Sequence, residues 1–373
     1  MCQVRAHGID TMALSVTGIW KNHEWFSCFR KMKSEAQEQS EDVNGIINTG
    51  GGSEWHFKMQ PNGSHGYEWL LVSNDFVLRI GRWTTKHTRP NAMIEIRSEM
   101  LWRMGAVKAK NQIIDMLAGM GLEIETVKPS RVDLCLDMLV PKSMWNKNLI
   151  DYAVTKAFDR TIHMRQGESI KGISIGSGKL VARIYDKPLE IRQKSGKIWM
   201  FDIWGLDEIP KEKIMARVEF QIRREAIKEM KIDVIGDFFE QEKGVWLYCS
   251  EKWLKFQDNI EAKNRRSRRT LEWWIEVQDG YNKSQEANPI VRKRILEWSQ
   301  KQLALQAYGV LISLQASELE KIDADVDQKI AINDVLHNFL DITTKQGKNE
   351  QEMNKKIKER RTKYRRMKAQ EEV

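Results

Sequence analysis

The chain has 373 residues and a mass of 43.7 kDa, and 41% of its residues are hydrophobic, so it is long enough for a sizeable core and for two domains. Its formal net charge of +9 favours a polyanionic partner, most commonly nucleic acid. Four widely spaced cysteines exclude a disulfide framework and a zinc-ligand pair, and no apolar run approaches the roughly 18 residues of a membrane span, so we expect a cytoplasmic protein with free thiols and no membrane partner.

The first part of the chain predicts a series of strands with two helices. Residues 8–16 predict a strand, Trp20–Asp42 a charge-rich helix, and the Gly-rich residues 48–53 a loop that lacks the Gly-Lys-Ser/Thr ending of a P-loop. Further strands are predicted at 55–59, 68–73, 76–81 and 92–99, and an apolar stripe predicts a helix over 106–118.

Three predicted strands in the second part each carry polar side chains on one face. The sets that share a face are Arg131, Asp133 and Asp137, then Arg183, Tyr185 and Lys187, then Arg217, Glu219 and Arg223. The second set belongs to a hairpin over 172–190 that turns at Gly-Ser-Gly. A strand with apolar neighbours is normally half-buried, so three polar faces require a reason. If the strands adjoin, one sheet face gathers a tyrosine, carboxylates and arginines, a set of groups suited to cleaving a phosphodiester.

Helices are predicted to connect these strands, over residues 146–158 and 224–240. The fold class is therefore α+β, with an antiparallel-rich central sheet and crossover helices. Residues 1–125 and 126–255 also suggest two duplicated halves, in which the aligned pairs are Asp10 with Asp133, Arg79 with Arg183, and Glu95 with Glu219. The first half has Gly81 where the second has Tyr185, so only the second half is expected to keep the reactive group.

Residues 256–373 are predicted to form a basic, α-helical region, with apolar stripes over 290–340. The arginines that we expect to contact DNA here are Arg265, Arg266, Arg268, Arg269, Arg360, Arg361, Arg365 and Arg366. The stretch Lys345–Val373 alone holds 11 Lys/Arg against 5 Glu, a net charge of 11 − 5 = +6. Such a surface can hold a phosphate backbone without reading its sequence, so the region is expected to serve DNA binding or assembly.

Tyr185 is the candidate nucleophile. A tyrosine hydroxyl has a reference pKa of about 10 and attacks phosphorus poorly unless cations stabilise its charged form. Arg183, Lys187 and Arg217 are the candidate cations. A covalent phosphotyrosine product would conserve the energy of the broken bond and allow religation. The alternative is a strand tyrosine that packs its ring and only hydrogen-bonds its hydroxyl.

Asp133, Glu219 and Asp137 are the candidate metal ligands. Carboxylates that converge from adjacent strands suit Mg²⁺ or Mn²⁺, which also bind water and substrate phosphate. The alternative is that Asp133 and Glu219 form buried ion pairs with Arg131 and Arg217. The seven histidines include no His-x-His pair, which argues against the histidine-rich metal site of many relaxases.

Together these motifs resemble a known family. The stretches RVDLCLD at 131–137, ARIYDK at 182–187 and RVEFQIRRE at 217–225, after an opening GIDT at 8–11, are similar in order and spacing to the rolling-circle replication initiation factors of the Rep_trans type. That family includes initiators of small plasmids and filamentous phages and related mobilisation relaxases. The resemblance covers residues 7–255 and implies a nicking domain with Tyr185 as nucleophile. It also implies acidic motif positions at Asp133, Glu219 and Asp137.

The expected function is therefore to nick one strand of double-stranded origin DNA, hold its 5′ phosphate on Tyr185 and leave a 3′-hydroxyl primer. A host helicase and a homodimer are further partners that this interpretation allows. Three alternatives stay open: a conjugative mobilisation relaxase of the same chemistry, a hydrolytic nuclease with Tyr185 as a bystander, and a non-catalytic DNA-binding protein. A stable protein–DNA adduct would separate the expected nickase from the hydrolytic nuclease. Nicking that EDTA abolishes would separate it from the non-catalytic DNA-binding protein.

Overall fold

The structure is a computed structural model. It describes residues 2–49, 54–84, 87–157, 159–164, 170–258, 268–283, 311, 332–345, 351, 353–355 and 357–358. Contacts divide the chain into two compact units, Met1–Leu296 and Glu297–Val373.

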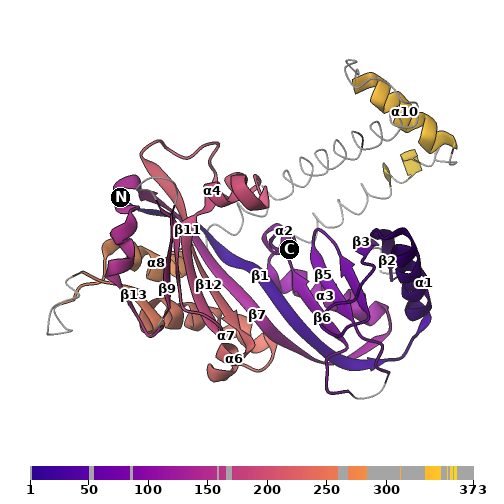
Figure 1. Cartoon of the computed structure of the whole chain (residues 1–373), viewed down its shortest axis with the longest axis horizontal. Helices are drawn as coiled ribbons and strands as arrows, with labels where there is room; N and C mark the ends of the chain where they lie inside the picture. The colour runs from indigo at the N-terminus through magenta and orange to yellow at the C-terminus, as the bar shows by residue number, and fades with distance from the viewer. Residues whose placement is uncertain are drawn as a thin grey trace. The chain divides into compact units, whose positions relative to one another are not determined.

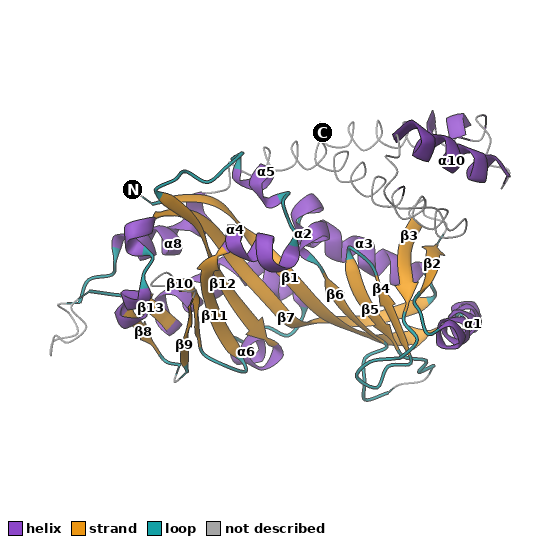
Figure 2. Cartoon of the chain, turned by 45° about the horizontal axis from the view of Figure 1, so that its top comes forward, coloured by secondary structure: helices purple, strands orange, loops and turns teal. Residues whose placement is uncertain are grey.

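An 11-stranded antiparallel sheet organises the first unit (Figures 1 and 2). Its strands, in spatial order, are β2 (Val43–Asn48), β3 (Glu54–Met59), β4 (Trp69–Val72), β5 (Phe76–Ile80), β6 (Ala92–Ile96), β1 (Gln3–Trp20), β7 (Leu122–Pro141), β12 (Lys213–Arg223), β11 (Leu180–Asp186), β10 (Ile170–Ile175) and β9 (Arg160–Met164). The central strands β1 and β7 have 18 and 20 residues and pair along nearly their whole length. The predicted α+β class with a large antiparallel sheet is confirmed.

Short helices connect and cover these strands. They are α1 (Glu24–Gln39), α2 (Ser98–Met104), α3 (Ala106–Gly119), α4 (Lys187–Glu190), α5 (Met200–Trp204), α6 (Arg224–Glu229), α7 (Ile235–Leu247) and α8 (Glu272–Lys283), with 3₁₀ turns η1 (Lys142–Met144) and η2 (Lys147–Tyr152) and π-helical turns η3 (Ile191–Ser195) and η4 (Tyr248–Trp253). A second, two-stranded sheet pairs β8 (Ala153–Thr155) with β13 (Leu254–Phe256). The helix α8 contacts β1 and β7, so the first unit extends beyond residue 255.

The strand order is symmetric about the central pair β1 and β7, and the duplication stays a prediction. Outward from β1 come β6, β5 and β4, and outward from β7 come β12, β11 and β10. In the first half the long strand β1 therefore adjoins β6, and in the second half the long strand β7 adjoins β12. Each of these partners is the last strand that its half contributes to the main sheet. The register changes one detail of the sequence match: Glu95 lies opposite Val77, whereas Glu219 lies opposite Arg183. When the two glutamates are aligned, Arg79 falls level with Tyr185 instead of Arg183.

The two faces of the central strands differ in chemistry because side chains alternate along a strand. One face, here called the apolar face, carries the fully buried Leu134, Leu136, Val218 and Phe220. The helices α7 and α8 cover it, and Trp246 of α7 meets Phe220 edge-on with ring centroids 5.2 Å apart. The opposite face, here called the polar face, carries the residues of the three predicted polar strands.

Two predicted helices are wrong in part. Residues 146–158 do not form a helix, because η2 ends at Tyr152 and the chain continues as β8, which contains the β-branched Val154 and Thr155. The helix predicted over 224–240 is two helices, α6 and α7, separated where Lys231 adopts a φ of 63°. The strands β2 and β9 and the helix α2 were not predicted, and α8 lies in the region that was predicted to be helical.

His7 on the apolar face leads to a testable pH dependence of stability. Its ring lies 4.3 Å from that of Tyr281, and burial lowers its pKa to about 4. The unfolded chain has a histidine pKa of about 6.5, so the folded state favours neutral imidazole, and this stabilisation is full above pH 6.5 and lost as the pH falls towards 4. We expect wild type to lose about 2 kcal/mol more unfolding free energy than His7→Phe between pH 7.5 and pH 5, measured by urea unfolding. Equal losses would contradict this.

In the second unit the structure describes the helix α10 (Ile332–Lys345). Most of the helical region predicted over 290–340 lies outside the described residues. All four cysteines are free thiols, as predicted. Within the described residues, no helix is both long enough and apolar enough to cross a membrane.

Candidate active site

The three polar strands are hydrogen-bonded neighbours in the sheet. Along β12, Arg217 lies between Asp137 of β7 and Tyr185 of β11, and Glu219 lies opposite Arg183. The polar side chains that the sequence placed on separate strands therefore share one face. Gln221 lies opposite Asp133 on this face and was not among the predicted site residues. The period of two that links Arg217 to Glu219 also leads to Gln221, so the sequence contained the signal for it.

Tyr185 is held by a carboxylate. Its hydroxyl donates a hydrogen bond of 2.9 Å to Oε2 of Glu219. Arg183 donates through Nη1 to Oε1 of Glu219 at 3.1 Å and through Nη2 to Oε1 of Gln221 at 2.8 Å. Burial, and then the negative charge of Glu219, raise the pKa of Tyr185 well above its usual value. The tyrosine is therefore protonated at neutral pH and donates its proton toward Glu219.

A pocket of about 550 Å³ opens beside this hydroxyl. Tyr185, Arg183 and Glu219 line it together with Lys171, Lys194 and His163. The imidazole Nε2 of His163 lies 2.9 Å from Oγ of Ser174 on the adjacent strand β10. Asp186 and Glu190 line it as well, so three cations and three carboxylates surround the pocket, and the exposed Lys171 and Lys194 are the groups available to a phosphate.

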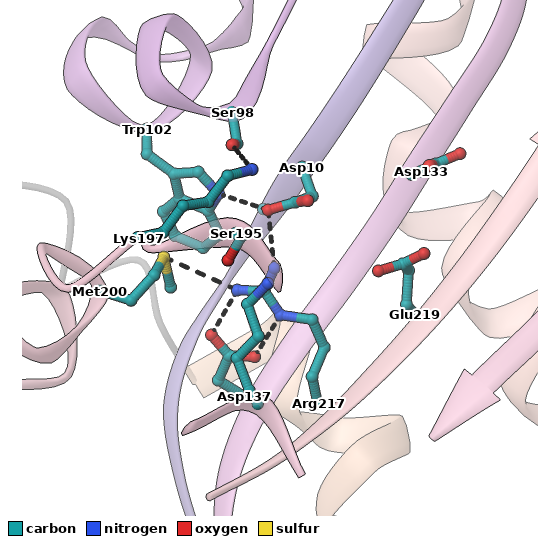
Figure 3. Close-up of polar contacts among 12 residues, drawn as sticks. Asp10, Ser98, Trp102, Asp133, Asp137, Ser195, Lys197, Met200, Arg217 and Glu219 are labelled. Atoms are coloured by element: carbon teal, nitrogen blue, oxygen red, sulfur yellow. Dashed lines mark hydrogen bonds and ion pairs between the residues drawn. The ribbon is translucent and has the colours of Figure 1, made fainter. Parts of the chain in front are cut away.

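A buried cluster lies beside the pocket on the same face (Figure 3). Arg217, with none of its side chain exposed, donates from Nε to Asp137 Oδ1 at 2.6 Å, from Nη2 to Asp137 Oδ2 at 2.7 Å and from Nη1 to Asp10 Oδ1 at 2.6 Å. Trp204 of α5 donates to Asp137 at 2.8 Å, and Trp102 of α2 donates to Asp10 at 3.2 Å. The cluster therefore ties two helices to the sheet.

Charge pairing sets the protonation of this cluster. Burial alone would lower the pKa of Arg217, but the charge of Asp137 raises it well above its usual value. Burial alone would raise the pKa of Asp10, but the charge of Arg217 holds it below its usual range. Arg217 and Asp10 therefore stay charged, and Arg217 forms buried ion pairs with both Asp10 and Asp137. Asp10 lies on β1 and was not predicted as a site residue; the sequence pointed to it only through its match with Asp133.

Asp133 has a different partner from Asp137. Its carboxylate accepts from Nε of Arg131 at 2.8 Å and pairs with Nη2 of the same arginine. Burial raises the pKa of Asp133 to about 7, the nearby charge of Glu219 adds to this, and Arg131 opposes it. Two buried carboxylates thus lie near each other, each paired with its own arginine, Asp133 with Arg131 and Glu219 with Arg183.

The described residues include no group of three His, Cys, Asp or Glu side chains arranged to hold a metal ion. Both oxygens of Asp137 are occupied by Arg217, so Asp137 does not fit as a ligand. Asp133 and Glu219 lie to one side of the Arg217 cluster in Figure 3, with no contact drawn to it. Their oxygens are also hydrogen-bonded, those of Asp133 to Arg131 and those of Glu219 to Arg183 and Tyr185. Because these two arginines are 32% and 38% exposed, a divalent ion that displaces them and takes its other ligands from water and phosphate is compatible with the two carboxylates.

Lys187 contacts the ring of Tyr185 from the start of a helix. The strand β11 ends at Asp186, whose side chain caps α4 by accepting from the backbone N–H of Leu189 at 3.0 Å. Lys187 starts that helix, and its Nζ binds Glu190 at 2.6 Å and lies 5.6 Å from the centroid of the Tyr185 ring. It supports the ring from a buried position.

Most of the predicted DNA-binding arginines lie outside the described residues: Arg265, Arg266, Arg360, Arg361, Arg365 and Arg366. Arg268 and Arg269 are described, just before α8. Arg269 is exposed, and its backbone N–H donates to Oδ1 of Asp258 at 2.9 Å. Their contact with DNA stays a prediction.

No family model and no curated protein matches this chain. Among solved structures, the rolling circle replication initiator protein from Geobacillus stearothermophilus matches with a TM-score of 0.42 and 12% sequence identity, covering 75% of this chain and 96% of that chain. A likeness at that level carries no argument about activity. The function of this chain has to be argued from its own residues.

Proposed function

We propose that this protein nicks one strand of DNA through Tyr185 and keeps the cut 5′ phosphate as a covalent adduct, which is the reaction that initiates rolling-circle replication. The observation that carries the proposal is the 2.9 Å hydrogen bond from the Tyr185 hydroxyl to Glu219, two residues that line a pocket together with Arg183. A buried tyrosine that served only packing would also find an acceptor for its hydroxyl, so the position of Tyr185 and Glu219 in the pocket lining is what favours a reactive role.

The geometry allows a balanced transesterification. As the Tyr185 oxygen attacks phosphorus, its proton moves to Oε2 of Glu219, the acceptor of its hydrogen bond. The bond from phosphorus to the 3′ oxygen breaks, and that oxygen takes a proton from solvent while Glu219 returns its proton to solvent, so a 3′ hydroxyl and a 5′-phosphotyrosine form. Arg183, with 38% of its side chain exposed, can contact Glu219 and the incoming phosphate together. Water is not consumed, so the bond energy is kept for religation.

The proposal includes a divalent cation, which would displace Arg131 from Asp133 and Arg183 from Glu219. Asp133 and Glu219 would hold Mg²⁺ or Mn²⁺, which would neutralise charge on the phosphate under attack. Arg217 and Asp137, which the sequence suggested as catalytic cation and metal ligand, instead position β12 against β7 so that Glu219 faces Tyr185. The proposed partners are double-stranded origin DNA and the strand that is cut.

Peptide mapping of the adduct tests this proposal. Wild type would be incubated with supercoiled DNA of the replicon that encodes it, with Mg²⁺, Mn²⁺ or EDTA, and the products separated on a denaturing gel. Trypsin should release Ile184–Arg192, IYDKPLEIR, in which Tyr185 is the sole tyrosine. We expect nucleotide mass on this peptide with metal and none with EDTA. Nicking without an adduct would indicate hydrolysis, and an adduct on another tyrosine would reject Tyr185.

A further inference from the structure

Four cationic side chains from separate parts of the first half converge on one turn between β3 and β4. Lys33 of α1 donates to the carbonyl of Glu68 at 3.0 Å, and Arg79 of β5 donates to Oγ of Ser64 at 3.4 Å. Arg89 donates to the carbonyl of Gly66 at 3.3 Å, and Arg82 lies 3.4 Å from the Glu68 carboxylate. We call Lys33, Arg79, Arg82 and Arg89 the N-terminal basic cluster.

The cluster has an excess of positive charge. Within the described residues, Glu68 is the one carboxylate in ion-pair contact with it, so four cations face one anion. The Arg82 side chain is 71% exposed, and Arg89 is also exposed. Gathering like charges is unfavourable unless a partner neutralises them, and the resulting potential attracts a polyanion.

Aromatic rings brace the loop that carries Arg82 and Arg89. The Trp83 ring stacks on His87 with centroids 4.6 Å apart and meets Tyr67 edge-on at 5.3 Å. Gly81 lies directly against the ring, since a Cβ there would fall 1.3 Å from it. The indole is therefore engaged in packing and is not a platform for a base. Contacts from this cluster would go to phosphate, which carries no sequence information.

The symmetric strand order of the sheet relates this cluster to the candidate active site. Arg79 is level with Tyr185 when the two halves are aligned on Glu95 and Glu219. The first half thus has a cation at the position where the second half has its candidate nucleophile. We propose that the N-terminal basic cluster holds the sugar-phosphate backbone of the DNA that the second half cuts; the inference rests on the proposed function in taking DNA as the substrate.

Salt-dependent binding tests the cluster. The full chain and an Arg82→Gln/Arg89→Gln variant would be titrated with a duplex of about 30 base pairs, and with one of its strands, over a series of salt concentrations in EDTA. Each phosphate contact contributes about 0.9 to the slope of log K against log salt for duplex and about 0.7 for a single strand. We expect the variant's slope to be smaller by about 1.8 on duplex or about 1.4 on single strand. Whether the slope falls for the duplex or for the single strand identifies which form of DNA the cluster binds.

Two further variants separate local contact from net charge and from misfolding. Lys108→Gln/Lys252→Gln removes the same charge at exposed positions elsewhere and should leave the slope unchanged. Arg82→Lys/Arg89→Lys keeps the point charges and should keep the slope. An unchanged slope in the Gln variant, an equal loss in the Lys108/Lys252 variant, or a wild type that binds neither DNA would overturn the proposal. Because binding is measured without cleavage, failure of the Tyr185 chemistry would not alter these results.

Discussion

Replacing Tyr185 by Phe is expected to abolish the covalent protein–DNA adduct while leaving DNA binding nearly unchanged. The substitution removes one oxygen atom and keeps the ring, which Lys187 supports from 5.6 Å. Glu219 keeps its contact with Arg183 at 3.1 Å, so its carboxylate is not left unpaired. The measurements are adduct yield on a denaturing gel and affinity for the same DNA in EDTA.

Two matched variants make this result specific. Tyr152→Phe changes a tyrosine that is exposed on η2 and should retain full adduct yield. Glu219→Gln keeps a hydrogen-bond acceptor but cannot take up the proton, so the adduct should still form about 10²–10⁴-fold more slowly, as for loss of a general base. A wild-type rate of adduct formation in Tyr185→Phe would refute the nucleophile, and a wild-type rate in Glu219→Gln would refute the proton acceptor.

The period of two was enough to identify the polar face. Asp133 and Asp137 on β7, Arg217 and Glu219 on β12, and Tyr185 on β11 all obey it, because these strands are regular through those residues. Lys187 lies where the pattern no longer applies. The strand ends one residue earlier, at Asp186, and Pro188 in the first turn of α4 is the sequence signal for that ending.

Which residues face each other could not be predicted from the sequence. Arg217 pairs with Asp137, 80 residues away in the chain, and with Asp10, 207 residues away. Register between such distant strands depends on the packing of the whole sheet, and local periodicity carries no information about it. For the same reason the sequence grouped Asp137 with Asp133 and Glu219 as metal ligands, although Arg217 occupies both of its oxygens.

The basic cluster shows the same limit. Lys33, Arg79, Arg82 and Arg89 are spread over α1, β5 and the loop that follows β5, with no dense run of charge to mark them. The arginine-rich stretches in residues 256–373 are conspicuous in sequence for the opposite reason. A surface assembled from single residues on several elements becomes visible only once the sheet brings them to one turn.

Asp137→Ala is expected to destabilise the protein by about 3–5 kcal/mol, the usual loss when one partner of a buried ion pair is removed. Arg217 has none of its side chain exposed and would lose two of its three carboxylate hydrogen bonds. Trp204 would lose its acceptor as well. Urea unfolding at neutral pH measures the change. Asp133→Ala is a suitable comparison with a smaller expected loss, since its partner Arg131 is 32% exposed and can be hydrated.

A double variant separates an unpaired charge from a lost contact. Asp137→Ala/Arg217→Met removes both charges, and an apolar replacement of a buried ion pair is often close to neutral, so it should recover much of the stability lost in the single variant. Asp10 then keeps only Trp102 as a hydrogen-bond partner, which limits the recovery. If the double variant were as unstable as Asp137→Ala alone, the role of the pair would lie in packing. If it were stable but formed the adduct slowly, Arg217 would be shown to position Glu219 for its contact with Tyr185, separately from its effect on stability.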